Sequence, residues 1–424
     1  MRSLVVLVLM SATAHADPLD LFGFGAEAAG QAGARTASAT GAEAAHYDPA
    51  AVALAERPTV LVGWGAAAMR LSIDGRDADV LDAHGTSLGL AVPIHDGDWT
   101  YAGAIGLYLP DQFLARIHLI PPTEPHFVLL DNDPHRVVVE PIAAASYRGR
   151  FAIGGGASIL ADASSRQIVF DVGIVAGQKV GEAALDIELP VRAAPLLGVW
   201  MRPHDRVRLA ATYRGQLSLD LRLDILANVQ VAGVVTGDAL VSIRAANYFT
   251  PARAQAGVAI DVADDLTVAA DLAWQRWSAF GSGLPDLRVL VALDLTPPLV
   301  STQNPPARFT DTIETRLGAE YRRAGDKTDL ALRAGAAYLP SPVPPQTGLT
   351  SFADGDRTLL TLGAGLTFAH WQPYLTRPLS IDLAIGWQHV APRLTKKDVT
   401  SFPGEAFSSD GEILQASLSS TIHF

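Results

Sequence analysis

The chain has 424 residues, no cysteine, 49% hydrophobic residues and a formal net charge of −12 at pH 7. Without cysteine, no disulfide stabilises the chain. The chain is acidic overall and contains no run of Lys or Arg that would indicate nucleic-acid binding. No segment approaches about 18 consecutive apolar residues, which excludes helical membrane spans.

The first residues predict a signal peptide over residues 1–16. Arg2 precedes the apolar run Leu4 to Met10, and the small-residue ending Ala14-His15-Ala16 predicts cleavage before Asp17. The mature chain is therefore expected to leave the cytoplasm. If it sits in a membrane, it must be a closed barrel, because every backbone polar group in lipid needs a partner.

Residues 17–57 are rich in Ala and Gly and do not alternate as a strand does. Such small residues cannot build a core of their own, so we expect this segment to occupy a cavity. Asp48 is a predicted N-cap and Pro49 a predicted first helical residue, which together indicate a short helix over Pro49 to Glu56. A flexible leader is the alternative interpretation.

Fourteen stretches after residue 57 alternate apolar and polar residues and are bounded by turn residues. Tight connections alternate with much longer ones, and an even strand number with this alternation is typical of bacterial outer-membrane barrels. We therefore predict one barrel over residues 58–424. The predicted strands cover residues 58–70, 86–94, 99–109, 136–147, 150–162, 191–202, 205–214, 252–262, 266–277, 311–322, 328–338, 358–368, 379–390 and 412–424.

The last stretch shows the two faces most clearly. Leu414, Leu418 and the terminal Phe424 share one parity, whereas Gln415 and Ser417 share the other. This period of two predicts a strand between lipid and water. The terminal aromatic residue is typical of the closing strand of an outer-membrane barrel. The alternative is the edge strand of a soluble sandwich.

Charged residues follow the same parity rule and are expected to face the lumen. Arg208, Arg316 and Arg333 alternate with apolar neighbours, and an arginine facing lipid at mid-membrane costs roughly 2–4 kcal/mol. These three lumen cations are candidate ligand-binding residues. The alternative is that they only pair with lumen carboxylates such as Glu314 and Glu320.

The seven tryptophans lie near predicted strand ends and predict interface girdles.

Several segments together resemble the outer-membrane long-chain fatty acid transporter (FadL) family, which includes uptake channels for toluene-like hydrocarbons. Tyr47-Asp48-Pro49-Ala50 resembles a hatch motif in which the family usually has Asn-Pro-Ala, and Asp48 departs from that Asn. Residues 163–250 match the family weakly. The other matching segments are Asp264 to Phe280, Phe309 to Tyr321, Leu332 to Gln346, Asp356-Arg357, Leu362 to Phe368, Gly23 to Ala53 and Trp99 to Arg116.

The resemblance implies an all-β, 14-stranded antiparallel transmembrane β-barrel whose lumen is plugged by a small N-terminal hatch of short helices. It implies passive uptake of hydrophobic solutes, either long-chain fatty acids or aromatic hydrocarbons, with lateral exit near the third strand. Phe113 and Leu114, in the loop after that strand, become candidate ligand contacts, and Tyr47, Asp48, Pro49 and Ala50 become the candidate gate.

The predicted partners are a hydrophobic small molecule or fatty acid, the lipid and lipopolysaccharide of the bacterial outer membrane, and the barrel assembly machinery. We expect a monomer with no cofactor, no metal and no nucleic acid. Two other functions are weighed. An enzyme barrel of the lipase or protease type needs a nucleophile motif that does not accompany His389 or His423, and the hatch-like segment and apolar loops argue against an open porin or an adhesin.

Overall fold

The computed structural model describes residues 18–111, 124–130, 137–160, 165–175, 178–188, 191–231, 235–281, 286–293, 307–346, 350–368, 377–397 and 406–424. Only the backbone is described for residues 18, 20, 165–175, 178–188, 219–231, 235–248 and 286–293. Among the described residues, no helix is long and apolar enough to cross a membrane.

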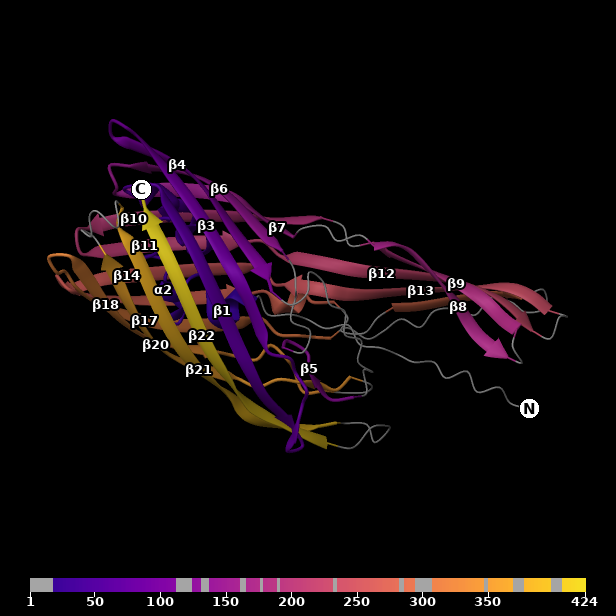
Figure 1. Ribbon diagram of the computed structural model, residues 1–424. Coiled ribbons are helices and arrows are strands. Elements are labelled where there is room, and N and C mark those ends of the chain that lie inside the picture. Colours follow the sequence, from indigo (N-terminus) through magenta and orange to yellow (C-terminus); the bar gives the residue numbers. More distant parts are fainter. Residues whose placement is uncertain are drawn as a thin grey trace.

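A closed ring of fourteen antiparallel strands forms the body of the molecule (Figure 1). The ring closes because β1 pairs on one side with β22, through Thr59 opposite His423, and on the other with β3, through Thr59 opposite Ala91. The barrel strands are β1 (Thr59–Ile73), β3 (Ala83–Asp96), β4 (Trp99–Pro110), β6 (Val138–Tyr147), β7 (Phe151–Leu160), β10 (Arg192–His204), β11 (Val207–Arg214), β14 (Arg253–Ala263), β15 (Leu266–Gln275), β17 (Thr312–Arg323), β18 (Thr328–Leu339), β20 (Arg357–Phe368), β21 (Leu379–Lys396) and β22 (Ala406–His423).

These strands confirm the fourteen predicted from sequence, with shifts at their ends. The largest differences are in β21 and β22, which extend further toward the long-loop end than predicted. Their pairing there continues past a register shift between Val390 and Arg393. A bulge of this kind interrupts the alternation from which the strand limits were predicted.

The two faces of the barrel wall differ as the parity rule predicts. Ile313 and Leu317 of β17 are 60% and 57% exposed on the outside, whereas Glu314 and Arg316 between them are 7% and 5% exposed. In β22, Leu414 and Leu418 are exposed, whereas Ser417 is buried. The outward set faces lipid in an outer-membrane barrel, and the inward set faces the lumen.

Five further strands lie outside the ring, in connections that the sequence analysis left without strands. They form one antiparallel sheet in the order β16-β13-β12-β9-β8, which extends away from the barrel (Figure 1). Their bounds are β8 (Ser165–Val175), β9 (Gln178–Glu188), β12 (Leu217–Val231), β13 (Val235–Thr250) and β16 (Asp286–Leu293). We name them the projecting sheet. Three two-residue strands complete the β structure: β2 (Arg76–Asp77) beside β1, and the parallel pair β5 (His126–Phe127) and β19 (Phe352–Ala353).

The N-terminal segment lies within the barrel and contacts its inner wall. Backbone amides of Ala26 and Ala32 donate to the hydroxyls of Ser419 and Thr361, both at 3.0 Å. Ala26 and Ala28 are fully buried. The short helices of this segment are α1 (Pro18–Phe22), α2 (Ala26–Ala29), α3 (Ala44–Tyr47) and the 3₁₀ helix η1 (Pro49–Leu54), and a second 3₁₀ turn, η2 (Trp277–Ala279), follows β15.

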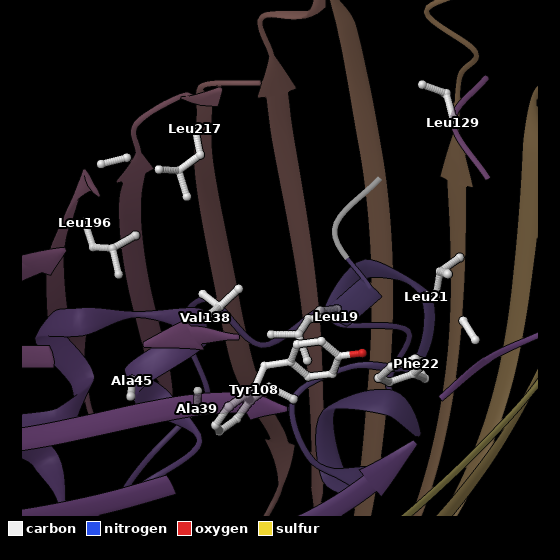
Figure 2. Packing of buried hydrophobic residues seen from close by; sticks show 14 of the residues in the cluster. Leu19, Leu21, Phe22, Ala39, Ala45, Tyr108, Leu129, Val138, Leu196 and Leu217 are labelled. Carbon is white, nitrogen blue, oxygen red and sulfur yellow. The ribbon is translucent and has the colours of Figure 1, made fainter. Parts of the chain in front are cut away.

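The hydrophobic core joins this segment to the wall. Figure 2 shows Phe22 of α1 near Tyr108 of β4, and Leu19 and Leu21 of α1 belong to the same buried cluster. The rings of Phe22 and Tyr108 are 6.1 Å apart, and both residues are buried. The core therefore lies between the N-terminal segment and the strands, where a water-filled pore would have a channel.

Candidate ligand path

Glycines of the wall let the helix η1 approach the strands closely. A Cβ on Gly154 of β7 would collide with the Pro49 backbone, and one on Gly198 of β10 would collide with the Asp48 carboxylate and the Ala50 amide. Pro49 and Ala50 are buried in this contact. The backbone of Asp48 to Ala50 therefore packs directly against the backbone of the wall strands, and glycine in the wall makes this close approach possible.

Asp48 is the N-cap of η1, and among the described residues no hydrogen bond or ion pair joins it to an arginine. Its Oδ1 accepts a hydrogen bond from the Ala50 amide at 2.9 Å, whereas its Oδ2 has no hydrogen-bond partner among the described residues. The side chain is fully buried, and this burial raises the pKa of Asp48 to about 8. Because residues 17–57 are predicted to occupy the cavity and arginines are predicted to face it, Asp48 is expected to face an arginine-bearing wall. This expectation is wrong, because the Asp48 carboxylate lies against the Ala50 amide and the Gly198 position of the wall.

Two further acids of the N-terminal segment, Glu43 and Glu27, contact arginine in different ways. Glu43 pairs at 2.8 Å with Arg35, which belongs to the same segment and not to the wall. Glu27 also pairs with Arg35 at 2.8 Å and reaches the wall at Arg333, 3.6 Å away. Burial and the charge of Glu27 raise the pKa of Glu43, whereas the arginine charges outweigh burial and lower the pKa of Glu27.

Tyr47, the fourth predicted gate residue, holds the first turns of the segment together. Its hydroxyl accepts a hydrogen bond from the Phe24 amide at 2.9 Å, and its ring lies edge-on to His46 with the centroids 4.9 Å apart. His46 in turn lies 3.1 Å from the Glu140 carboxylate of β6. Tyr47 and His46 therefore connect α3 both to the N-terminal turns and to the wall.

The three predicted ligand-binding arginines are each paired with carboxylates. Arg333 donates to Asp382 at 2.6 Å and to Glu320 at 2.7 Å. Arg316 pairs with Glu314 at 2.9 Å and donates to the Ala32 carbonyl oxygen at 3.0 Å. Arg208 pairs with Asp261. Arg206 has the same parity as Arg208, which predicts that it faces the lumen. It is instead half exposed in the turn before β11 and pairs with Asp264 at 2.8 Å.

Two cavities flank the N-terminal segment. One, of about 90 Å³, lies toward the long-loop end and is lined by Leu19, Trp277, Leu339 and Arg357 among others. The other, of about 590 Å³, lies toward the short turns, where His423 and Arg57 contribute to its lining. Arg316 lines the first cavity, whereas Arg208 and Arg333 line the second, so the three predicted arginines do not form one site.

Arg357, the first residue of β20, is a site candidate that the sequence analysis did not select. It lines the first cavity with only 8% of its surface exposed. Across the described part of the chain it makes no hydrogen bond and no ion pair within 4.0 Å, although its charge acts on the buried Asp354. Burial raises the pKa of Asp354, which weakens this carboxyl as a counter-ion. The sequence signal was present only as Asp356-Arg357, one of the matching family segments.

An aromatic cluster borders the same cavity at the long-loop end. Trp277 of η2 contacts Phe249 and Phe309, with ring centroids 6.0 and 6.3 Å apart, and Phe309 contacts Phe280 and Phe352 at 4.9 and 6.0 Å. All five rings are buried. Through Trp277, the cluster contributes an apolar surface to the cavity that Arg357 also lines.

The prediction of tryptophan girdles is right for four residues and wrong for two. Trp64, Trp99, Trp274 and Trp387 are exposed on the outer face. Trp200 points inward and donates from Nε1 to the Ala37 carbonyl oxygen at 3.1 Å, and Trp277 is buried in the aromatic cluster. Strand-end position alone cannot distinguish an outward ring from an inward one. Trp371 and the candidate contacts Phe113 and Leu114 lie outside the described residues.

Comparison with solved structures shows the same fold. A FadL homologue from Pseudomonas aeruginosa superposes with a TM-score of 0.59 at 18% identity, covering 99% of this chain and 100% of that one. The P. putida toluene transporter TodX gives 0.55 at 17%, covering 95% and 99%, and the Ralstonia pickettii toluene transporter TbuX gives 0.51 at 17%, covering 95% and 99%. No curated protein matches the chain.

The family model described as outer membrane protein transport protein (OMPP1/FadL/TodX) matches residues 196–421, more than half of the chain. This match covers the strands from β11 to β22 that carry Arg357 and the aromatic cluster. The chain therefore belongs to the OMPP1/FadL/TodX family of bacterial outer-membrane β-barrels, which transport hydrophobic compounds and are not enzymes.

Proposed function

We propose that the protein takes up long-chain fatty acids, with the carboxylate bound at Arg357 and the alkyl chain against the aromatic cluster. The single observation that carries this choice is the unpaired, buried Arg357 guanidinium in the first cavity. A buried cation without a counter-ion costs free energy, and an anionic ligand removes that cost. A neutral hydrocarbon leaves it in place.

The charge of the cavity lining supports the same choice. Arg214, Arg253, Arg316 and Arg357 line it, whereas Glu314 is the one carboxylate among its lining residues in the described chain. Glu140 lies outside the lining and pairs with Arg214. Arg357 is the lining arginine that makes no ion pair among the described residues, and its positive charge attracts a carboxylate in a site from which water is partly excluded.

Passage beyond the cavity requires the N-terminal segment to move or the wall to open. The pairing of β6 with β7 supports a lateral exit, because it is interrupted between the pairs Val139–Ile159 and Ile142–Gly156. In this gap, Glu140 and Pro141 do not pair with β7. Pro141 has no amide hydrogen to donate there. By contrast, β4, the third strand of the ring, pairs with β3 and β6 along most of its length.

Uptake of aromatic hydrocarbons is the second candidate, favoured by the aromatic cluster. Binding of palmitate and of toluene to the purified barrel in lipid nanodiscs separates the two. We expect Arg357→Met to weaken palmitate binding about 10- to 100-fold, the range for losing a hydrogen bond to a charged group, and to leave toluene binding unchanged. Arg76→Met, which removes an exposed arginine, is the matched control.

Equal palmitate affinity for the intact protein and Arg357→Met contradicts the assignment of Arg357. Binding of toluene with no binding of palmitate replaces fatty acids by hydrocarbons as the substrate class. Because Arg357 lies at the first residue of β20, folding of the variant is checked by the heat-dependent migration typical of intact barrels.

A further inference from the structure

One face of the projecting sheet is made almost entirely of apolar and small residues. The charged exception is Lys179, which lies opposite Ile174 near the start of β9. Residues directly opposite one another in neighbouring strands share a face of a sheet. The register places Leu223 of β12 opposite Ile187 of β9 and Ile243 of β13, and Ile243 opposite Leu287 of β16. The apolar positions of this face include Ile168, Phe170, Val172, Ala183, Leu185, Ile187, Leu221, Leu223, Ile225, Ala239, Val241, Ile243, Leu287, Val289 and Val291.

The opposite face has a different composition. Its positions include Asp186, Arg222, Asp224, Arg244 and Arg288, together with a row of apolar residues across the middle of the sheet. Charges of both signs at these positions suit contact with water. The projecting sheet is therefore amphipathic, with one face suited to water and the other to burial.

No described helix or strand packs over the apolar face. Apart from its own strands, the projecting sheet has an extended contact only where β12 leaves the barrel beside β10. β13 and β16 pair over eight residues. With strands about 4.8 Å apart and about 3.3 Å per residue, the face measures roughly 24 by 26 Å, or on the order of 600 Å². An apolar patch of that size on a soluble surface marks an interaction site.

We propose that this face binds the same face of a second copy of the chain, so that two barrels associate through their projecting sheets. The area argues for this partner, because a standard protein interface buries about 800 Å² on each side, close to what the pleated face offers. Two such sheets pack face to face about 10 Å apart with strands nearly aligned. A two-fold axis along the membrane normal keeps both barrels in one membrane and aligns the strands in this way.

A lipid partner fits less well. The projecting sheet extends from the long-loop end of the barrel, beyond the strands whose outer face contacts hydrocarbon (Figure 1). The surroundings there are water and the sugars of lipopolysaccharide, which offer no continuous apolar surface. A dimer replaces the monomer that the sequence analysis expected, and this proposal is independent of the nature of the transported compound.

The test uses two neighbouring positions of β13 that lie on opposite faces, in a full-length chain with no native cysteine. Val241→Cys is on the apolar face and Ser242→Cys is its control. In isolated outer membranes, a bismaleimide that spans about 10 Å, the spacing of packed sheets, should cross-link Val241→Cys into a dimer and leave Ser242→Cys monomeric.

Light scattering on the protein in amphipathic polymer gives the second measurement. Val241→Lys should raise the dimer dissociation constant tenfold or more, because two buried like charges face each other across the interface, and Ser242→Lys should leave it unchanged. Monomeric intact protein, equal cross-linking at both positions, or equal shifts for the two lysine variants overturns the proposal. If Val241→Lys fails to fold, the cross-linking result decides alone.

Discussion

At the scale of single residues, the lumen is organised by pairing. Arg333 contacts Asp382 and Glu320, and Arg316 contacts Glu314, so most buried charges are neutralised inside the wall itself. Breaking a buried pair costs about 3–5 kcal/mol because a charge is left without a partner. Paired arginines therefore stabilise the barrel, whereas the unpaired Arg357 is available to a ligand.

Asp48 is the residue whose ionisation bears on the position of the N-terminal segment. Its pKa is about 8 when buried, whereas a solvent-exposed Asp ionises near 3.8. Between these two pKa values, Asp48 is protonated when the N-terminal segment is bound in the barrel and ionised when the segment is released into water. Binding of the segment therefore weakens as the pH rises from about 4 to about 8, and it changes little above pH 8. We expect more conductance at pH 8.5 than at pH 5.

Asp48→Asn tests this assignment. The amide oxygen can still accept the Ala50 amide, and the side chain stays neutral at every pH, so the pH dependence of conductance in planar bilayers should shrink. Asp48→Ala, which loses the cap at a cost of about 1 kcal/mol, should raise conductance at both pH values. An unchanged pH dependence in Asp48→Asn assigns the effect to other groups, of which Glu43 also has a raised pKa.

At the scale of elements, the last strand completes the ring. β22 pairs with β21 and with β1 along nearly its whole length, and the Phe424 amide donates to the Pro58 carbonyl oxygen at 2.9 Å. The Phe424 ring is 46% exposed on the same side as Leu414 and Leu418. An exposed terminal ring contributes little to the core, which leaves it accessible to another protein during assembly.

Removal of Phe424 should lower the amount of folded protein in the outer membrane, because we expect the barrel assembly machinery to bind this terminal aromatic residue. Phe424→Tyr, which keeps an aromatic ring, should assemble normally. The fraction that migrates as the compact form before heating measures folded protein. If the shortened chain reaches the same folded amount as the intact chain, the terminal residue has no role in assembly.

At the scale of the whole molecule, the ring of strands stabilises the barrel, whereas the N-terminal segment blocks the path through its lumen. The ring of strands satisfies its own backbone hydrogen bonds, and wall charges such as Arg316 and Glu314 pair without the N-terminal segment. That segment separates the two cavities, through contacts such as those of Phe22 with Tyr108 and Ala32 with Thr361. The barrel should therefore fold without the segment, while the path through it should not remain closed.

Deletion of residues 22–52, with residues 1–21 kept, tests this separation of roles. We expect a folded barrel whose conductance is several times higher and which leaks small hydrophilic solutes, because the two cavities then join. Conductance in planar bilayers and heat-dependent migration measure the two properties. The idea is falsified if the shortened barrel folds and conducts as the intact protein does.

The sequence by itself determined the ring. Within each strand, alternate side chains face lipid or the lumen, and this alternation is visible over a few residues. The outward position of Leu317 and the inward position of Arg316 could therefore be predicted without knowing which strands lie next to theirs. The N-cap at Asp48 is equally local, because it depends on Pro49 and Ala50. Local rules of this kind require no register between strands.

Only the tertiary structure decided which of these residues meet. Arg333 pairs with Asp382, 49 positions away, whereas Arg357 makes no ion pair among the described residues, although both lie on strands with the same alternation. The Trp200 ring likewise meets the Ala37 carbonyl oxygen, 163 positions away. Pairing is set by barrel closure and by the placement of the N-terminal segment, which bring together residues too far apart in the chain for any short-range pattern to record.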